Sequence, residues 1–267
     1  MRAMLISLLI IVGIAAAMYA GMCALLYLHQ DDVLFYPRAN DRSLAARWAP
    51  YRVEIPSGEH VLEGFWTENG ASTSTRTVIY FGGNAEDVLY TASTAFELAI
   101  RRMLVVNYRG YGGSAGTPSQ AALYEDALAI YDYAIANGTQ PQDIVVMGRS
   151  LGSGLATMLA AKREVHSAIL ITPYDSLAEV AARHYPMFPV RLLLKHPFDS
   201  APFAQEAHVP ALMLAAEQDN IIPPIHAQCL HDLWAGPRQL HILNGVGHND
   251  IERHPDHHTL INAFLAD

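Results

Sequence analysis

Residues 143–162, DIVVMGRSLGSGLATMLAAK, carry the strongest indication of how this 267-residue chain folds. The β-branched run DIVVM predicts a strand, and the Ala- and Leu-rich run from Leu151 to Lys162 predicts a helix directly after it. Between them, residues 148–152 (GRSLG) fit the pattern G-x-S-x-G. Glycines on both sides of such a turn allow the serine a strained backbone above the end of the strand. Ser150 is therefore the first candidate for a reactive side chain.

A second G-x-S-x-G match lies at residues 112–116 (GGSAG). Pro118 follows it closely and prevents a long helix from beginning there, so we expect Ser114 to be a loop residue. Residues 110–115 also fit G-x-G-x-x-A, the pattern of a dinucleotide site. Such a site needs a helix N-terminus at the pyrophosphate, which Gly116 and Pro118 exclude. We therefore predict no dinucleotide cofactor.

Strand-like and helix-like runs alternate along the rest of the chain. Two initial strands followed by repeated strand–helix units predict an α/β fold with a mostly parallel central sheet flanked by helices. The expected strands are 52–55, 61–66, 77–81, 103–108, 143–147, 167–171, 211–215 and 239–243; the expected helices are 86–101, 119–137, 151–162, 224–233 and 256–265. We expect one domain at residues 51–267, with an insertion at about 176–207, after a connecting segment at 31–50.

The composition excludes several classes of protein. With 51% hydrophobic and 16% charged residues, the chain is not intrinsically disordered. A net charge of −9 makes nucleic acid an unsuitable partner. Two cysteines, Cys23 and Cys229, give no disulfide framework.

The N-terminal residues 1–30 are expected to form a single-pass membrane anchor. Residues 3–28 carry no charge, and as a helix they would extend roughly 39 Å, more than a ~30 Å hydrocarbon core. A cleaved signal peptide is the alternative, with the alanines at 15–17 as its cleavage site. Cleavage there would leave the apolar residues 18–28 on the mature protein, which favours the anchor. The flanking basic residues leave open which side of the membrane carries the domain.

A serine nucleophile needs a base, and that base needs an acid to hold it. Asp219 comes just after the buried run at 211–215, and His248 lies in a Gly-rich loop after the run at 239–243. The chain order Ser150, Asp219, His248 and the positions after strands suit a catalytic triad. Asp175 also follows a strand and is the alternative acid.

These motifs together resemble the α/β-hydrolase superfamily, and more narrowly its single-pass, membrane-anchored group of bud-emergence-type proteins and animal protein depalmitoylases. The resemblance implies an oxyanion hole formed by the backbone N–H groups of Asn84 and Leu151. Many relatives have His-Gly-Asn-Ala where this chain has Gly82 in place of the histidine, a change that leaves a backbone donor intact. The matching residues are Gly83-Asn84-Ala85, residues 107–112, residues 148–152, Asp219 and Gly247-His248.

The triad predicts a serine hydrolase that cleaves carboxylic ester or thioester bonds through an acyl-enzyme, with no metal or organic cofactor. A serine peptidase uses the same triad, and a non-catalytic, membrane-bound binding module is an alternative of a different class. Three histidines near two carboxylates could suggest a metal, but the H-E-x-x-H pattern is absent and a solvated loop explains them. They are His254, His257 and His258, near Asp250 and Glu252.

The insertion at 176–207 is apolar and aromatic, and it is interleaved with Arg183, Arg191 and Lys195. One interpretation is a packed connector whose hydrophobic side chains complete the core. The other is a small cap that lines an acyl pocket near the bilayer, with its basic side chains facing anionic headgroups. The second interpretation predicts a small-molecule or lipid-like acyl substrate with a medium or long chain.

Overall fold

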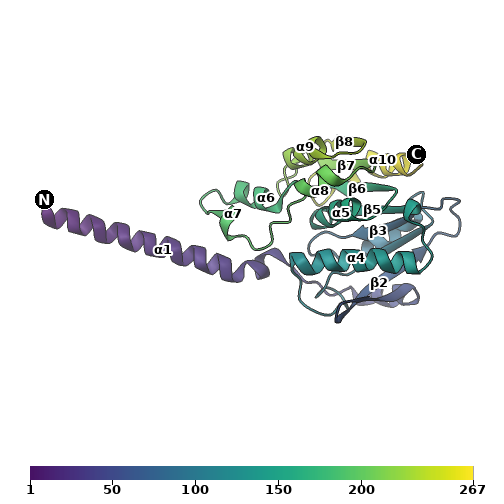
Figure 1. The fold of residues 1–267 in the computed structure, drawn as a ribbon, viewed down its shortest axis with the longest axis horizontal. Helices are drawn as coiled ribbons and strands as arrows, with labels where there is room; N and C mark the ends of the chain where they lie inside the picture. Colours follow the sequence, from purple (N-terminus) through teal and green to yellow (C-terminus); the bar gives the residue numbers. More distant parts are fainter. Residues whose placement is uncertain (267) are drawn as a thin grey trace.

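A mixed eight-stranded sheet forms the centre of the domain in the computed structural model, which describes residues 1–266 (Figure 1). The strand order is β1-β2-β4-β3-β5-β6-β7-β8; β1, β2 and β4 pair antiparallel, and all pairs from β4 to β8 are parallel. The predicted α/β class with a mostly parallel sheet is confirmed. The strands are β1 (Arg52–Ser57), β2 (His60–Glu68), β3 (Thr77–Phe81), β4 (Arg102–Val106), β5 (Ile144–Arg149), β6 (Ser167–Ile171), β7 (Ala211–Ala216) and β8 (Arg238–Leu243).

Helices cover both faces of this sheet. Because successive strand side chains point to opposite faces, Ile79 and Phe81 of β3 pack with α4 and α5, while Val78 and Tyr80 pack with α3 and α10. The helices of the domain are α2 (Arg42–Trp48), α3 (Val88–Ala92), α4 (Gln120–Ala136), α5 (Leu151–Lys162), α6 (Leu177–His184), α7 (Val190–Leu193), α8 (Ala201–Glu206), α9 (Pro224–Leu233) and α10 (Asp256–Ala266). The two apolar layers fix the positions of the strand ends.

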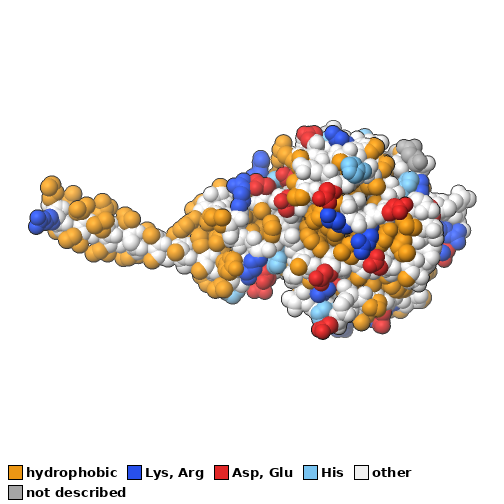
Figure 2. All heavy atoms as spheres, in the orientation of Figure 1, with side chains coloured by type: hydrophobic (Ala, Val, Ile, Leu, Met, Phe, Trp, Pro, Cys, Tyr) orange, Lys and Arg blue, Asp and Glu red, His pale blue; other side chains and the backbone are white. Residues whose placement is uncertain are grey.

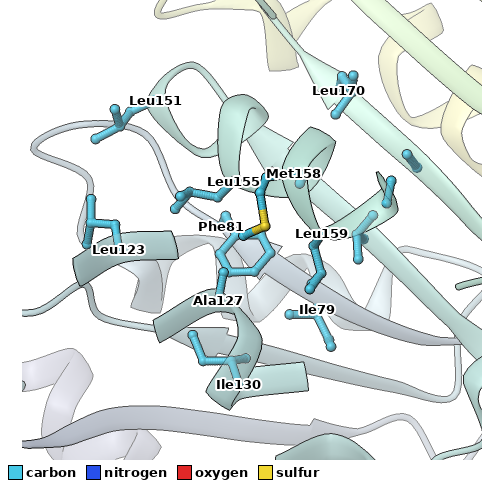
Figure 3. Close-up of a cluster of buried hydrophobic side chains, with 14 of the residues drawn as sticks. Ile79, Phe81, Leu123, Ala127, Ile130, Leu151, Leu155, Met158, Leu159 and Leu170 are labelled. Carbon is cyan, nitrogen blue, oxygen red and sulfur yellow. The ribbon is translucent and has the colours of Figure 1, made fainter. Parts of the chain in front are cut away.

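Helix α5 packs very close to the central strands. Figure 3 shows Leu155, Met158 and Leu159 of α5 around Phe81 of β3, inside a cluster of buried hydrophobic side chains. A Cβ on Gly152 would overlap the carbonyl of Phe81, so only glycine permits this approach. The first turn of α5 is thereby held against the end of β3.

The predicted helix at 86–101 is wrong. The structure has the short α3, then a 3-10 turn at Ser93–Phe96, and no regular helix from there to β4. The hydroxyls of Ser93 and Thr94 donate to the carbonyls of residues three positions earlier. Such local bonds compete with the helical ladder and end the helix early. The expected strand at 103–108 also ends sooner, at Val106.

The N-terminal helix α1 (Arg2–Leu34) extends away from the domain, and none of its residues is buried (Figure 1). It is the one helix in residues 1–266 that is long and apolar enough to span a membrane, with a mean hydropathy of 2.4 in its most apolar window. It continues past residue 30 into the expected connecting segment. That segment also contains α2, which Asp41 caps by accepting from the N–H groups of Ser43 and Leu44.

The insertion at 176–207, called the cap segment below, contains α6, α7 and α8. Its second half packs into the domain, where Phe198 and Ala204 are fully buried. Its middle part, residues 185–193, is called the cap tip below and exposes Met187 and Leu192. A bridge between Ser176 and Asp199 closes the base of the segment. Ala178 and Val180 of α6 are also buried, so the packed-connector interpretation describes both ends of the segment but not the cap tip.

Candidate active site

Ser150 occupies the sharp turn between β5 and α5. Its backbone has φ +51° and ψ −117°, a strained conformation for a residue with a side chain. The Ser150 N–H donates to the carbonyl of Ile171 in β6 at 2.9 Å, and the Ser153 hydroxyl donates to the Ser150 carbonyl at 2.7 Å. These two bonds hold the turn from both sides, so the Ser150 side chain stands in one defined position.

The structure brings the three predicted triad residues together. His248 Nε2 lies 2.9 Å from Ser150 Oγ, and His248 Nδ1 lies 2.7 Å from Asp219 Oδ2. The Asp219 and His248 side chains are both buried. A carboxylate that contacts an imidazole, which in turn contacts a serine hydroxyl, is the arrangement that activates a serine as a nucleophile.

The loop after β7 fixes the Asp219 carboxylate. Oδ1 accepts hydrogen bonds from the N–H groups of Ile221 and Ile222, at 2.9 and 2.7 Å. Oδ2 is left to accept from His248. Because both oxygens have fixed partners, the carboxylate can hold the imidazole in the tautomer with its proton on Nδ1.

A mostly buried ion pair connects the His248 loop to the loop after β3. Arg149 Nη2 donates to the His248 carbonyl at 3.1 Å, and Arg149 Nη1 lies 3.4 Å from Glu86 Oε2. Glu86 Oε2 also accepts from the Gly83 N–H at 2.7 Å. Burial lowers the pKa of the Arg149 guanidinium, but neighbouring charges, led by Glu86, outweigh it and raise that pKa overall. The guanidinium therefore stays charged while it bridges the two loops.

The ion pair between Glu86 and Arg149 and its place beside the site were not predicted from the sequence. Arg149 lies inside the G-x-S-x-G match and Glu86 lies just after Gly83-Asn84-Ala85. Two charged residues directly beside buried strands were the available signal, because a charge in such a place needs a partner.

The loops that carry Asn84 and Leu151 lie at the same edge of the sheet. β3 pairs with β5 so that Phe81 is opposite Gly148, and each loop begins within three residues of that pair. Leu151 is the first residue of α5, where a backbone N–H has no partner within the helix. The predicted oxyanion donors are thus neighbours, and their role in catalysis stays a prediction.

The Asn84 side chain has contacts that the sequence did not predict. Its Nδ2 donates to the carbonyl of Leu34, the last residue of α1, at 2.6 Å. Its Oδ1 accepts from the Tyr36 N–H at 3.1 Å and from the Tyr111 hydroxyl at 2.7 Å. Burial raises the pKa of Tyr111 to about 12, so its hydroxyl keeps the proton it donates. The end of α1 is therefore bound directly to the loop beside Ser150.

The alternative residues have other partners. Ser114 lies in a loop, as predicted, where its buried hydroxyl donates to the Asn107 carbonyl at 2.7 Å. Asp175 accepts from His226 Nδ1 at 2.7 Å, so Asp219 and not Asp175 contacts His248.

The three C-terminal histidines have separate environments. His258 lies 3.5 Å from Glu97, and His254 lies 4.0 Å from Asp256. His257 is buried, and burial lowers its pKa to about 4. Within residues 1–266, no three His, Cys, Asp or Glu side chains gather as metal ligands would.

Comparison with known proteins identifies one fold. A family model described as the alpha/beta hydrolase fold matches residues 77–201. Among solved structures, the esterase Pf2001 of Pyrococcus furiosus has a TM-score of 0.68 and 19% sequence identity, covering 87% of this chain and 98% of the esterase. The predicted α/β-hydrolase fold is confirmed.

Curated relatives cover most of this chain. An uncharacterized protein of Mycobacterium tuberculosis is 32% identical over 253 residues, which are 91% of this chain and 88% of the relative. The lysophosphatidylserine lipase ABHD12 of Xenopus tropicalis is 29% identical, over 75% of this chain and 60% of the lipase. Protein bem46 of Schizosaccharomyces pombe is 26% identical, over 81% of this chain and 76% of bem46. The predicted resemblance is confirmed, and these likenesses support hydrolase activity.

Proposed function

Because the chain belongs to the α/β-hydrolase family, we propose that it is a serine hydrolase that cleaves carboxylic esters or thioesters through an acyl-enzyme. One observation carries the proposal: a continuous chain of hydrogen bonds runs from Asp219 through His248 to Ser150. The three residues come from loops at three different strand ends, β5, β7 and β8. A purely structural network has no need of this combination.

In the proposed first half-reaction, Ser150 Oγ attacks the acyl carbonyl and His248 Nε2 takes its proton. The tetrahedral intermediate collapses as the imidazolium gives that proton to the leaving alcohol or thiol. Asp219 stabilises the imidazolium and keeps its proton on Nδ1. In the second half-reaction, His248 deprotonates a water that attacks the acyl-enzyme. The imidazolium then returns the proton to Ser150 Oγ as the ester bond to the serine breaks and the carboxylic acid leaves. The steps use only side chains and water.

The proposed oxyanion donors are the backbone N–H groups of Asn84 and Leu151. Each is expected to lower the barrier by on the order of 3 kcal/mol, because a fixed dipole meets the charge that develops on the carbonyl oxygen. The ion pair of Arg149 and Glu86 supports this assignment, since it holds the Gly83 N–H and the His248 carbonyl in one network. Substitution of Gly82 for the histidine of relatives leaves these backbone donors in place.

The proposed substrate is a small-molecule or lipid-like acyl compound, and the proposed location is a membrane. An esterase and a lipase are among the similar proteins, which favours an ester over the amide of a serine peptidase. We propose that residues 1–30 anchor the domain at 51–267, with 31–50 as connector. The exposed apolar surface of α1 supports the anchor.

The experiment that tests the function combines a fluorophosphonate probe with turnover of p-nitrophenyl esters. We expect Ser150→Ala to abolish probe labelling and turnover, while Ser114→Ala keeps both if circular dichroism shows it folded. Retention of both by Ser150→Ala, with their loss in folded Ser114→Ala, would overturn the assignment. Absence of any labelling in folded native protein would favour the binding module.

A further inference from the structure

The cap tip contacts α1 far from the end of that helix. The Tyr19 hydroxyl donates to the Met187 carbonyl at 2.7 Å, and the Tyr19 ring stacks on Phe188 with centroids 6.1 Å apart. Tyr19 precedes Leu34, the last residue of α1, by 15 positions, which is about 22 Å along the helix. The cap tip therefore extends along α1 toward its N-terminus.

The sequence of α1 places Tyr19 at a defined depth if the helix spans a bilayer. The uncharged run covers residues 3–28, and a hydrocarbon core takes about 20 helical residues. A window of about that length starts at residue 3 to 9 and ends at residue 22 to 28, so every placement contains Tyr19. Met187 and Phe188, which contact Tyr19, then lie at the level of the acyl chains.

The chemistry of these contacts suits that environment. A tyrosine hydroxyl among acyl chains needs a partner, and the Met187 carbonyl supplies one. Met187 is 77% exposed and Leu192 is 86% exposed, an unfavourable state for apolar side chains in water. Figure 2 shows hydrophobic side chains continuing from α1 onto the adjoining part of the domain.

Polarity rises toward the end of α1, as it does across a membrane interface. Gln30 Nε2 donates to the Leu193 carbonyl at 3.0 Å, and Gln30 Oε1 accepts from the Lys195 N–H at 2.6 Å. Asp31 lies 3.5 Å from Lys195 Nζ and 3.1 Å from His196 Nε2. These polar contacts begin eleven residues after Tyr19, about 16 Å along the helix.

The one charged side chain in the cap tip, that of Arg191, does not oppose insertion of the tip. Arg191 is paired with Glu179 by two hydrogen bonds, at 2.5 and 2.6 Å, which neutralises the pair. Arg183 stands near the end of α6, before the tip. A basic side chain just outside an inserted segment suits anionic headgroups, because long basic side chains reach the interface while their stems stay in apolar surroundings.

We propose that the cap tip inserts into the same bilayer leaflet as α1, so that the enzyme takes its acyl substrate directly from that leaflet. The proposal rests on the proposed function and on the membrane anchor. The bond between Leu34 and Asn84 supports it, because the end of α1 that leaves the membrane is also the part bound beside Ser150. The substrate class is then a membrane-dissolved acyl lipid.

The test uses the full chain in phosphatidylcholine vesicles, with Cys23 and Cys229 replaced by alanine. An environment-sensitive fluorophore is attached to a cysteine at one of three positions: Met187→Cys, Met22→Cys in α1, or Tyr90→Cys, an exposed position on α3. Lipids with a nitroxide on the acyl chain quench fluorophores within the hydrocarbon. We expect strong quenching at positions 187 and 22 and none at position 90.

Quenching at position 22 but not at 187 would overturn the proposal while leaving the anchor intact. Quenching at neither position would overturn both. Fluorophosphonate labelling of the same samples reports the proposed chemistry independently, because it needs only Ser150 and its partners.

A kinetic test examines the consequence for substrate uptake. We expect Met187→Asp combined with Leu192→Asp to lower turnover of a long-chain ester in vesicles by at least about tenfold, because the charges oppose insertion. Turnover of a water-soluble short-chain ester should not change, and Tyr90→Asp should change neither. Equal loss on both esters in a folded variant would contradict uptake from the leaflet.

Discussion

At the residue scale, the candidate site depends on a few side chains whose orientation is fixed by backbone groups. Asp219 is held by two N–H groups, and the Ser150 turn is held by bonds on either side. His248 lies between them and is held through its carbonyl by Arg149. Each proposed reacting group therefore has a separate structural support.

Replacing Asp219 by asparagine should lower kcat on the order of 10³- to 10⁴-fold with little change in stability. The amide has nearly the shape of the carboxylate, but its NH₂ group favours the wrong imidazole tautomer and it has no charge to stabilise the imidazolium. Steady-state kinetics on a p-nitrophenyl ester measure the loss. An Asp175→Asn variant, whose side chain binds His226 instead, is the control. A greater loss of kcat in the control would contradict the assignment.

Removing the guanidinium in Arg149→Met should lower the free energy of unfolding by about 3 kcal/mol, because Glu86 is left as a mostly buried charge with no cationic partner. Adding Glu86→Gln to this variant should recover part of the loss, since the unpaired charge is then gone. Urea unfolding of the two single variants and the double variant gives the coupling free energy. Strictly additive effects would show that the two side chains do not interact.

His257 should make stability depend on pH. Its pKa is lowered from 6.5 to about 4 in the folded state, so the unfolded chain binds more protons between those values. The contribution to stability is therefore full above about pH 6.5 and falls, by up to about 3 kcal/mol, as the pH drops toward 4. We expect His257→Leu to flatten the curve of unfolding free energy against pH. His258→Leu should flatten it much less, because the His258 charge is a smaller cause of the lowered pKa of His257 than burial is. An unaltered curve in His257→Leu would refute this linkage.

At the element scale, the sequence predicted those elements whose local signals agreed with their packing. The observed limits of α5 and α9 agree with the predicted ones, because a strained serine turn begins one helix and Pro224 begins the other. The 86–101 helix failed because hydroxyl side chains ended it after two short turns. The spacing of apolar residues, on which the prediction is based, does not detect side-chain hydroxyls that compete with backbone N–H groups for the helix carbonyls.

The three triad residues could be proposed because each follows a recognisable strand. Contacts across long sequence separations could not. Asn84 binds Leu34, fifty residues earlier, and Arg149 binds the His248 carbonyl, 99 residues later. No local pattern carries such pairings, because they depend on how the strands are ordered in the sheet.

Helix α1 should remain part of the mature protein. We expect the native protein to stay in the membrane fraction after high-salt and carbonate washes, because an apolar helix of this length is very stable in a bilayer. N-terminal sequencing of the membrane-bound protein checks the same point. A mature chain that begins near residue 18 or 21 would establish a cleaved signal instead.

At the scale of the whole molecule, helix α1, the cap segment and the proposed active site form one connected structure. The end of α1 contacts the loop of Asn84, and the middle of α1 contacts the cap tip. An anchor that served only as a tether would need neither contact. The arrangement suits the proposed membrane-anchored enzyme, with its proposed substrate in the same membrane.

The central claim is that Ser150 carries the acyl group during turnover. The most direct measurement is rapid acid quenching of the enzyme during hydrolysis of a p-nitrophenyl ester, followed by mass spectrometry of the intact protein and its peptides. Our account predicts an added mass equal to one acyl group, located on the peptide that contains Ser150 and absent from Ser150→Ala. An acyl group on another residue, or full turnover by the Ser150→Ala variant with no adduct, would contradict it.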